Sequence, residues 1–337
     1  MKSPDSKEFP KWPVYSKDER NAVEAVLESG KVNYWTGSEC IRFEEEYAKY
    51  LDVKYAISLA NGTTALDLAL HSIGVGKGDD VVVPSKTFIA TASSVVIRGA
   101  RPVFADIDPD SQNITVDTIK SVITPDTRAI IAVHFAGWPC DMDPILEFAR
   151  DNEILIIEDC AQAHGAQYKN KNIGSLSDVA VFSFCQDKII STGGEGGMFV
   201  TNNIEFYEKA WSYKDHGKSA KTRERTGSGN GHLWVHNSIG TNYRMTEMQA
   251  SIGRIQLRKL NEWVGIRQRN AQILSDGFSQ IPGLRIVSPE KNIQHAYYKY
   301  YVFVENEMLK PEWDVNHIIS EINLDSTPCF RGGCSEV

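Results

Sequence analysis

Short apolar runs alternate along the chain with longer segments in which apolar residues recur every three or four positions. The apolar runs are rich in valine and isoleucine, which is typical of buried strands. They cover residues 54–60, 80–84, 101–105, 129–135, 154–159, 178–184 and 197–201. Helical patterns lie between most of these runs, at residues 16–29, 41–51, 63–73, 88–98 and 141–152. This alternation predicts an α/β fold with a mainly parallel sheet that helices cover on both faces.

A longer helical pattern follows over residues 246–275 and predicts a helix that bridges to a second unit. We therefore expect a large domain over residues 1–245, which includes an N-terminal segment. The bridging helix and a smaller C-terminal α/β domain are then expected over residues 246–337. A chain of 337 residues is long enough for a large core and a second, smaller one.

Composition argues against several classes of protein. Hydrophobic residues make up 42% of the chain and charged residues 24%, the balance of an ordinary globular protein. The net charge of −8 argues against a nucleic-acid partner, because surfaces that bind nucleic acid are usually basic. No apolar run approaches the roughly 20 residues that span a bilayer, and the N-terminus has no apolar segment for export. We expect neither a nucleic acid nor a membrane as partner.

The six cysteines show neither a Cys-x-x-Cys pair nor the spacing of zinc ligands. Cys140, Cys160 and Cys185 lie in apolar or strand-end contexts, which predicts buried thiols. Free thiols are typical of a reducing cytoplasm. We therefore expect a cytoplasmic protein without a bound metal.

The most informative chemistry follows the strand-like run at residues 178–184. Lys188 comes soon after this run, and four glycines follow it by residue 197. A strand that ends in a lysine and a glycine-rich turn can deliver an amine to a fixed point in a site. A desolvated lysine amine is nucleophilic at neutral pH and can condense with an aldehyde. The alternative is a surface lysine beside a glycine turn, since most charged side chains face water.

A second segment joins a strand-like run to a helical pattern through Asn61, Gly62, Thr63 and Thr64. Free backbone N–H groups and the positive end of the helix dipole meet at such a junction, and both favour a bound phosphate. Gly62 permits close approach of the backbone, and the two threonines carry hydroxyl donors. The alternative is an ordinary helix N-cap, because asparagine and threonine are good capping residues.

A third segment, residues 154–166, begins with a continuous apolar run that ends in Glu158 and Asp159. Ligands of open α/β sheets bind beyond the carboxyl ends of strands, so we expect Asp159 to point into that crevice. A carboxylate there can hold a protonated pyridine nitrogen, and Gln162 could reach a ring hydroxyl. The alternatives are a helix N-cap for Asp159 and plain surface positions for Glu158 and Gln162.

A fourth segment, residues 79–92, is again a strand, a turn and the start of a helix. Phe88 falls just past the strand end, where an aromatic face could cover a planar cofactor. The alternative is a core position, which is the commoner place for a phenylalanine.

Together these segments resemble the DegT/DnrJ/EryC1/StrS family of pyridoxal-phosphate aminotransferases, which act mostly on sugars. The matching runs are residues 39–50, 61–70, 80–92, 99–108, 158–166, 182–201 and 240–250. The resemblance implies the fold type I of pyridoxal-phosphate transferases, with a large domain and a smaller C-terminal α/β domain. Relatives usually continue for several tens of residues beyond the motif that resembles residues 328–337, so we expect an incomplete small domain.

The resemblance also implies roles for individual residues. Lys188 would bond to the aldehyde of the cofactor and then carry a proton between the substrate carbon and the cofactor. Asp159 would pair with the pyridine nitrogen and Gln162 with the ring oxygen, while Phe88 would stack on the ring.

The phosphate group would be held from two subunits. Small polar positions of one subunit would surround it, and these are Gly62, Thr63, Thr64 and Ser183. Asn242 would reach the phosphate of the neighbouring subunit, which makes a homodimer obligatory for function. Without the resemblance, Asn242 is a polar residue before a helix.

The implied activity is transamination of a keto group on a nucleotide-linked sugar, with L-glutamate as the expected donor, in amino-sugar and surface-polysaccharide biosynthesis. Sugar dehydratases of the family replace the lysine with histidine, so Lys188 favours the aminotransferase. Synthases of aromatic amines or aminocyclitols keep the lysine and remain alternatives. A catalytically idle regulator is a further alternative, although an idle site has no physical need to keep four such residues together, namely Lys188, Asp159, Gln162 and Ser183.

Residues 214–225 contain the densest group of basic residues. Asp215, Glu224 and several small polar residues lie among them, which predicts a solvated loop. The functional alternative is contact with the diphosphate of a nucleotide-linked substrate.

Overall fold

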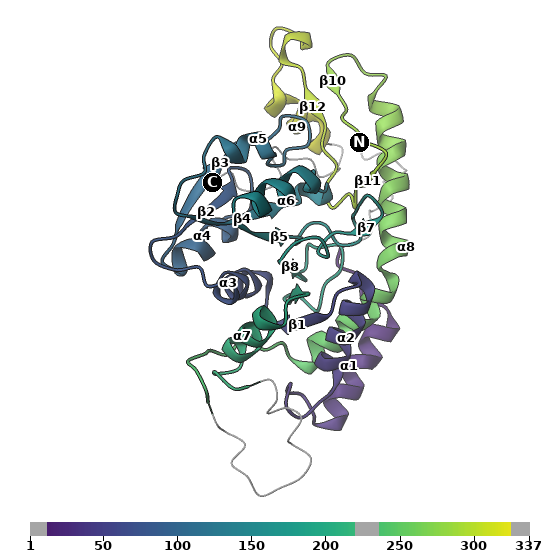
Figure 1. Ribbon diagram of the computed structural model, residues 1–337. Coiled ribbons are helices and arrows are strands. Elements are labelled where there is room, and N and C mark those ends of the chain that lie inside the picture. Colours follow the sequence, from purple (N-terminus) through teal and green to yellow (C-terminus); the bar gives the residue numbers. More distant parts are fainter. Residues whose placement is uncertain (1–11, 220–235, 325–337) are drawn as a thin grey trace, which may run out of the picture.

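The computed structural model describes residues 12–219 and 236–324 (Figure 1). A central seven-stranded sheet has the strand order β1-β9-β8-β5-β4-β2-β3. Its strands are β1 (Tyr55–Leu59), β2 (Asp80–Pro84), β3 (Arg101–Ala105), β4 (Thr127–Val133), β5 (Leu155–Asp159), β8 (Val179–Ser183) and β9 (Gly197–Thr201). Neighbours pair in parallel from β8 across to β3, whereas β9 runs antiparallel to both β8 and β1. The prediction of a mainly parallel sheet is confirmed.

Helices cover both faces of this sheet, which explains why its strands are continuous apolar runs. Figure 1 shows α5 (Val116–Lys120) and α6 (Met142–Asp151) on one side of the sheet. On the other side lie α3 (Gly62–Ser72), α4 (Ala90–Ile97) and α7 (Ile204–Lys214). Every residue of β2, β8 and β9 is buried, as expected for strands enclosed between two helical layers.

A long helix, α8 (Glu247–Phe278), runs along one flank of the molecule and packs against α1 (Lys17–Ser29) and α2 (Glu39–Leu51). Its 32 residues correspond to about 48 Å at 1.5 Å per residue. Thr246 caps its N-terminus in a capping box with Gln249. The amine of Lys259 reaches the buried carboxylate of Glu19 at 2.6 Å, which ties α8 to α1.

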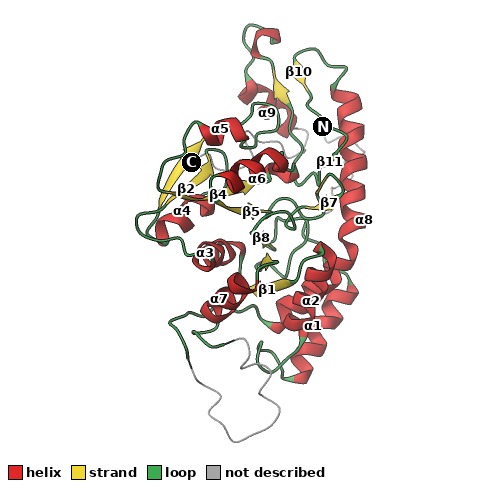
Figure 2. Ribbon diagram, viewed as in Figure 1, coloured by secondary structure: helices red, strands yellow, loops and turns green. Residues whose placement is uncertain are grey.

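The chain beyond α8 contains short pieces of structure (Figure 2). They are β10 (Leu284–Arg285), β11 (Ile293–Gln294), β12 (Phe303–Val304), the 3₁₀ helix η3 (Asn306–Met308) and α9 (Val315–Leu324). β10 pairs with β12, whereas β11 pairs with β6 (Gln167–Tyr168), which also pairs with β7 (Lys171–Asn172). The chain therefore returns, after α8, to the segment that follows β5.

The predicted strands are confirmed, with ends that lie within two residues of those expected. The long helix is also confirmed, whereas α5 and α7 were not predicted. A division of the chain at residue 246 stays a prediction, and residues 328–337 lie outside the described part. Among the described residues, no helix combines the length and the apolar character that a membrane span requires.

The prediction of a solvated loop over residues 214–225 is wrong for its first part. Lys214 ends α7 and is fully buried, and Lys218 is 2% exposed. The Lys214 amine lies 3.5 Å from the centroid of the Tyr34 ring, and the Lys218 amine lies 3.5 Å from the Asp215 carboxylate. An aromatic face and a buried carboxylate thus compensate for the lost hydration of these amines. Residues 220–225 lie outside the described part.

Candidate active site

The carboxylate of Asp159 stands at the carboxyl end of β5, where the apolar run predicted it. The side chain is buried, and its oxygens accept hydrogen bonds from the Thr91 hydroxyl at 3.2 Å and from the Ala161 N–H at 3.1 Å. Burial raises the pKa of Asp159, and these two bonds and the positive charge of Lys188 oppose that rise only in part. A buried carboxylate of this kind is stabilised by a cationic partner.

Gln162 lies in the turn after β5 and is 5% exposed. Its side-chain oxygen accepts a hydrogen bond of 2.7 Å from the N–H of Ala136, in the 3₁₀ helix η1 (Phe135–Gly137) that follows β4. Ala136 has a left-handed backbone, with φ of 57°. The loops after β4 and β5 therefore fix the Gln162 amide next to Asp159.

The N-terminus of α3 meets the ends of β8 and β9 at the same edge of the sheet. A Cβ atom on Gly62 would lie 2.6 Å from the Cβ of Ser183, and one on Gly197 would lie 2.3 Å from the carbonyl oxygen of Asn61. Neither position has room for a larger residue without movement of its neighbour. The backbones of α3 and β8 thus approach each other closely, as a cradle for a small anion requires.

The two threonines at this N-terminus are not equivalent. The hydroxyl of Thr64 donates to the Asn61 carbonyl at 2.8 Å and belongs to the capping box of α3. Thr63 is exposed, and no hydrogen bond of its side chain occurs within the described residues. Ser183 accepts a hydrogen bond of 3.3 Å from the N–H of Cys185 and keeps its own proton for a further partner.

Lys188 lies in the turn after β8, and its side chain is 15% exposed. Its amine lies 3.1 Å from the carboxylate of Asp187 and 3.4 Å from the hydroxyl of Tyr298. The indole N–H of Trp12 donates to the Lys188 carbonyl at 3.1 Å. Both the backbone and the amine of Lys188 are therefore held in place.

The glycine-rich turn closes the loop behind Lys188. Gly193 and Gly194 have φ angles of 86° and 123°, a backbone region that favours glycine. The Gln186 N–H then donates to the Gly194 carbonyl at 3.0 Å, and the Phe184 N–H donates to the Gly196 carbonyl at 2.7 Å. This closure returns the chain directly to β9, and it confirms the predicted tight turn.

Phe88 and Asn242 lie at the surface. Phe88 is 57% exposed, and its carbonyl accepts a hydrogen bond of 3.0 Å from the N–H of Thr91, the residue that supports Asp159. Asn242 is also exposed, and its side-chain oxygen accepts from the N–H of Arg244 at 3.3 Å. No contact within the described residues joins Asn242 to Lys188 or Asp159.

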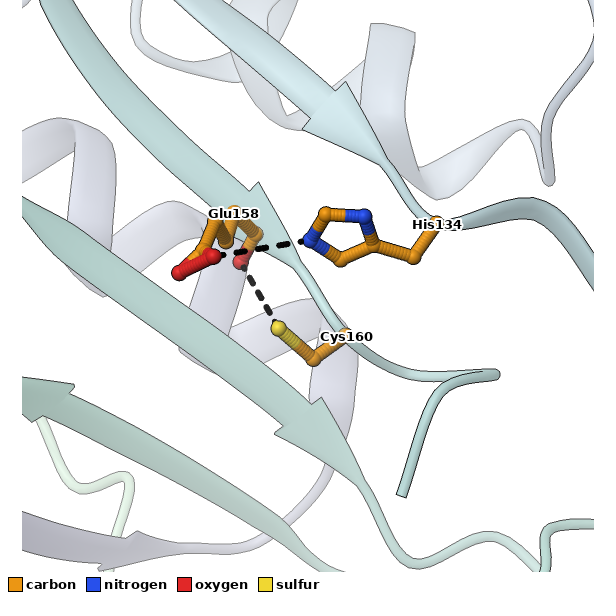
Figure 3. Close-up of side chains that lie close together, drawn as sticks. All are labelled: His134, Glu158 and Cys160. Carbon is orange, nitrogen blue, oxygen red and sulfur yellow. Dashed lines mark hydrogen bonds and ion pairs between the residues drawn. The ribbon is translucent and has the colours of Figure 1, made fainter. Parts of the chain in front are cut away.

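A buried group of His134, Glu158 and Cys160 lies beneath the edge of the sheet (Figure 3). The Nδ1 of His134 accepts a hydrogen bond of 3.0 Å from the Cys140 N–H, so its Nε2 carries the proton and faces Glu158 at 3.6 Å. Burial raises the pKa of the Cys160 thiol, which favours the protonated form over the thiolate that a metal requires. The Glu158 carboxylate already accepts hydrogen bonds from the N–H groups of Gly174 at 3.0 Å and Leu176 at 3.3 Å, so this donor set is a poor metal site. The alternative of plain surface positions for Glu158 and Gln162 is wrong, since both side chains are buried.

Sequence reasoning missed three residues of the site. Thr91 supports Asp159, and Asp187 and Tyr298 contact the Lys188 amine. Asp187 is adjacent to Lys188 in the sequence, so the charge next to the amine was a visible signal. Tyr298 has no local signal, because it reaches the site by a tertiary contact across 110 residues.

A family model described as the DegT/DnrJ/EryC1/StrS aminotransferase family matches residues 13–335. The chain belongs to this family. An aminotransferase from Psychrobacter cryohalolentis has a similar solved structure, with a TM-score of 0.94 and 48% identity over 97% of this chain and 85% of that one. The GDP-perosamine synthase of Caulobacter vibrioides is 40% identical over 297 residues, which are 88% of this chain and 77% of that protein. The dTDP-3-amino-3,4,6-trideoxy-alpha-D-glucose transaminase of Streptomyces venezuelae is 38% identical over 265 residues, which are 78% of this chain and 66% of that protein.

Membership of the DegT/DnrJ/EryC1/StrS aminotransferase family confirms the predicted fold type I and the predicted class of enzyme, an aminotransferase. Pyridoxal phosphate is the cofactor of such enzymes. The geometry described above fits this group. Asp159 is a buried carboxylate suited to a cationic ring nitrogen, Gly62 lets the N-terminus of α3 approach Ser183 closely enough for both to reach one phosphate, and Lys188 offers an amine.

Proposed function

We propose that this aminotransferase converts a keto group of a nucleotide-linked sugar into an amine, with L-glutamate as the donor. Two relatives whose names state a nucleotide-linked amino sugar support the substrate class. A third relative, the spore coat polysaccharide biosynthesis protein SpsC of Bacillus subtilis, is 36% identical over 330 residues and supports a role in polysaccharide biosynthesis. The retained Lys188 favours this reaction over the dehydration that histidine-containing relatives carry out.

The proposed roles of the residues follow from their positions. When bound, pyridoxal phosphate supplies an aldehyde for covalent bonding to amines and a ring that accepts electrons. Asp159 keeps the ring nitrogen protonated, because a buried carboxylate favours a cation beside it. Gln162 donates its amide hydrogens to the ring oxygen. Lys188 takes a proton from the carbon that bears the amino group of the donor, and in the second half of the reaction it gives a proton to the sugar carbon. Such proton transfer by a positioned side chain typically raises the rate about 10²–10⁴-fold.

The phosphate roles are proposed for the cradle at the start of α3. Backbone N–H groups at Gly62 and Thr63 point along the helix axis, and the helix dipole favours an anion there. The hydroxyls of Thr63 and Ser183 add donors from two elements. Thr64 acts through the cap, since its hydroxyl is engaged with Asn61. Phe88, an exposed aromatic just before α4, is available to cover the cofactor ring.

One observation carries the proposal. The amine of Lys188, with a side chain that is 15% exposed, and the buried carboxylate of Asp159 both lie beyond the carboxyl ends of paired strands. Asp159 ends β5 and Lys188 lies in the turn after the neighbouring strand β8, so the same edge of the sheet presents the nucleophile and the partner of an electron-accepting ring.

The test uses the absorbance of the purified protein. We expect a yellow protein whose visible band disappears when L-glutamate is added and returns when the correct nucleotide-linked keto-sugar is added. A panel of such sugars identifies the substrate. If Lys188→Ala protein responds to glutamate as the unaltered protein does, the proposal is wrong. Bleaching by another amino acid instead would replace glutamate as the donor.

We propose a homodimer in which Asn242 binds the phosphate of the other subunit. Exposed apolar residues recur with helical spacing along α4 and its N-cap, and these are Ile89, Val96 and Ile97. A spacing of seven or eight residues places such side chains on one helix face. A second copy of the chain would remove this face from water, and the exposed Asn242 is free to cross the interface.

Two inactive variants test the shared site. Lys188→Ala and Asn242→Asp proteins are each expected to be inactive, since aspartate repels a phosphate. In a mixed dimer, one site then keeps both Lys188 and Asn242, so coexpression restores activity. Coexpressed variants that stay inactive, although the mixed dimer is isolated, contradict the shared site. A monomer by light scattering contradicts the dimer.

We also propose a cytoplasmic location. The cysteines of the described residues, Cys40, Cys140, Cys160 and Cys185, are free thiols, as is common where the medium is reducing. Fractionation of cells that express the protein tests this location.

A further inference from the structure

A segment beyond α8, residues 293–301, lies against the loop that holds Gln162. It begins with β11, which pairs with β6. The Ala296 N–H donates to the Gly137 carbonyl at 2.9 Å, and the Lys299 N–H donates to the Ala136 carbonyl at 3.2 Å. Gly137 has φ of 94°, and a Cβ there would lie 3.1 Å from the backbone nitrogen of Tyr298. The segment is therefore tightly docked at the backbone level.

From this segment the side chain of Tyr298 reaches the reactive lysine. Tyr298 is 8% exposed. Its hydroxyl donates to the carboxylate of Asp187 and lies 3.4 Å from the amine of Lys188. The same amine lies 4.8 Å from the centroid of the Tyr298 ring, within cation–π range. The tyrosine thus contacts both the amine and the carboxylate beside it.

Asp187 supplies a fixed negative charge. Burial raises the pKa of Asp187, but the hydrogen bond from Tyr298 and the charge of Lys188 outweigh that effect and lower the pKa to about 2. The carboxylate is therefore ionised at neutral pH, 3.1 Å from the lysine amine. The carboxylate therefore holds the amine by an ion pair, and the hydroxyl of Tyr298 lies on the same amine.

We propose that Asp187 and Tyr298 form a dock that holds the Lys188 amine whenever the amine is not bonded to the cofactor. This inference rests on the proposed function, in which the lysine must leave the cofactor and still move protons beside it. A lysine side chain has many rotamers, so an unheld amine would spend much of its time elsewhere. Asp187 and Tyr298 are positioning residues, and Tyr298 makes the dock depend on the 293–301 segment.

The other charged and titratable groups around the dock do not replace it. They lie on β5, the turn after it, the turn after β8, α8 and the 293–301 segment, and they are Asp159, His164, Cys185, Arg267 and Lys299. Asp159 is engaged with Thr91 and Ala161. Burial lowers the pKa of His164 to about 4, so His164 is neutral at pH 7.

The test measures the reactivity of the Lys188 amine in cofactor-free protein by competitive labelling with acetic anhydride and peptide mapping. The contacts with Asp187 and Tyr298 restrain the amine and cover it, so the dock protects the amine from the reagent. At pH 8 we expect labelling of Lys188, relative to the other lysines, to rise about threefold to tenfold in Asp187→Asn protein. In Tyr298→Phe protein a smaller rise in the same direction is expected. Asp187→Glu, which keeps the charge, is expected to restore most of the protection.

A matched control lies on the same segment. The hydroxyl of Tyr300 pairs with Ser275 of α8 at 2.8 Å and, within the described part of the chain, forms no hydrogen bond with Asp187 or Lys188, so Tyr300→Phe removes the same atom from another place. We expect labelling of Lys188 in this variant to match that of the unaltered protein. The dock is refuted if Asp187→Asn leaves the labelling of Lys188 unchanged, or if Tyr300→Phe changes it as much as Tyr298→Phe does.

The labelling of Lys188 in Asp187→Asn protein decides whether the dock exists, for two reasons. The Asp187 side chain is 49% exposed, so Asp187→Asn is a mild change for folding, and its labelling result suffices by itself. The experiment requires neither cofactor nor turnover. Failure of the dock therefore appears as unchanged labelling, whereas failure of the proposed function appears as absence of bleaching by glutamate.

Discussion

Two regions meet at Lys188, and they reach it in different ways. The first is the carboxyl edge of the central sheet, where Asp159 and Ser183 each end a strand. The second is the 293–301 segment, which arrives after the 32-residue helix α8 and touches Lys188 through Tyr298. The first region takes its geometry from strand pairing, whereas the second depends on a few backbone hydrogen bonds. The comparison teaches that strand pairing positions Asp159 and Ser183, whereas one of the two side chains that hold the Lys188 amine, Tyr298, comes from a segment outside the sheet.

The largest effect is expected where the sheet edge supplies a charge. Asp159→Asn keeps the size of the side chain and removes the negative charge that holds the ring nitrogen protonated. We expect kcat to fall by about 10²–10³-fold, the usual cost of a lost electrostatic contact in a site. Steady-state kinetics with the sugar identified above measures it.

The Asp159→Asn variant also tests whether Asp159 stabilises the folded protein. Thermal unfolding of the cofactor-free variant should be equal to or above that of the unaltered protein, because a buried charge has been removed. A fall of less than tenfold in kcat, with normal cofactor content, contradicts the role of this edge.

A smaller effect is expected at Gly62, where the lack of a side chain lets α3 approach β8 closely. In Gly62→Ala protein the new Cβ would press on Ser183, since the ideal position lies 2.6 Å from its Cβ. We expect the dissociation constant of pyridoxal phosphate to rise about tenfold, which corresponds to about 1.4 kcal/mol. Absorbance titration of the cofactor-free protein measures this.

Gly277 provides the matched control for Gly62. It lies in α8, and a Cβ there would meet nothing within 4 Å. Gly277→Ala is expected to leave cofactor affinity unchanged and to stabilise the protein by up to about 1 kcal/mol, because alanine is the better helix former. Equal cofactor affinity in the Gly62→Ala and unaltered proteins would remove the argument for a phosphate cradle.

The smallest effect concerns a histidine packed beneath the sheet edge. His164 donates from Nε2 to the carbonyl of Ser183 at 2.8 Å, and its Nδ1 lies 3.1 Å from the hydroxyl of Tyr47. Burial lowers its pKa to about 4, whereas an unfolded histidine titrates near 6.5. Between these values the unfolded chain binds a proton that the folded chain does not, so stability is lost as the pH falls from about 6.5 to about 4.

The slope of this loss is at most about 1.4 kcal/mol per pH unit for one group. Denaturant unfolding of cofactor-free protein at several pH values measures it, with His164→Asn as the comparison. The variant is expected to be less stable at pH 7 but to show a flatter dependence between pH 4 and pH 6.5. Parallel curves for the two proteins would show that His164 does not titrate in this way.

The sheet edge was largely predictable from the sequence, and the 293–301 segment was not. The apolar runs predicted where β5 and β8 end, and parallel strands bring such ends to one edge. That geometry is local to each strand, so Asp159 and Lys188 could be predicted as a pair. The roles of Phe88 and Asn242 came from the family resemblance and stay predictions.

The contact of Tyr298 with Lys188 could not be predicted, because no pattern near Tyr298 in the sequence indicates where the chain packs after α8. Its position depends on the pairing of β11 with β6 and on the fit of Tyr298 against Gly137. The burial of Lys214 was missed for the same reason, since the Tyr34 ring that covers it comes from far along the chain. Contacts that depend on tertiary packing leave no periodic signal.

Treatment of the cofactor-loaded protein with borohydride, followed by peptide mapping, tests the central claim most directly. Reduction makes the bond between the cofactor and its lysine permanent. The account predicts one labelled peptide, with the reduced cofactor on Lys188. Label on another lysine, or a loaded protein that yields no labelled peptide, would contradict it.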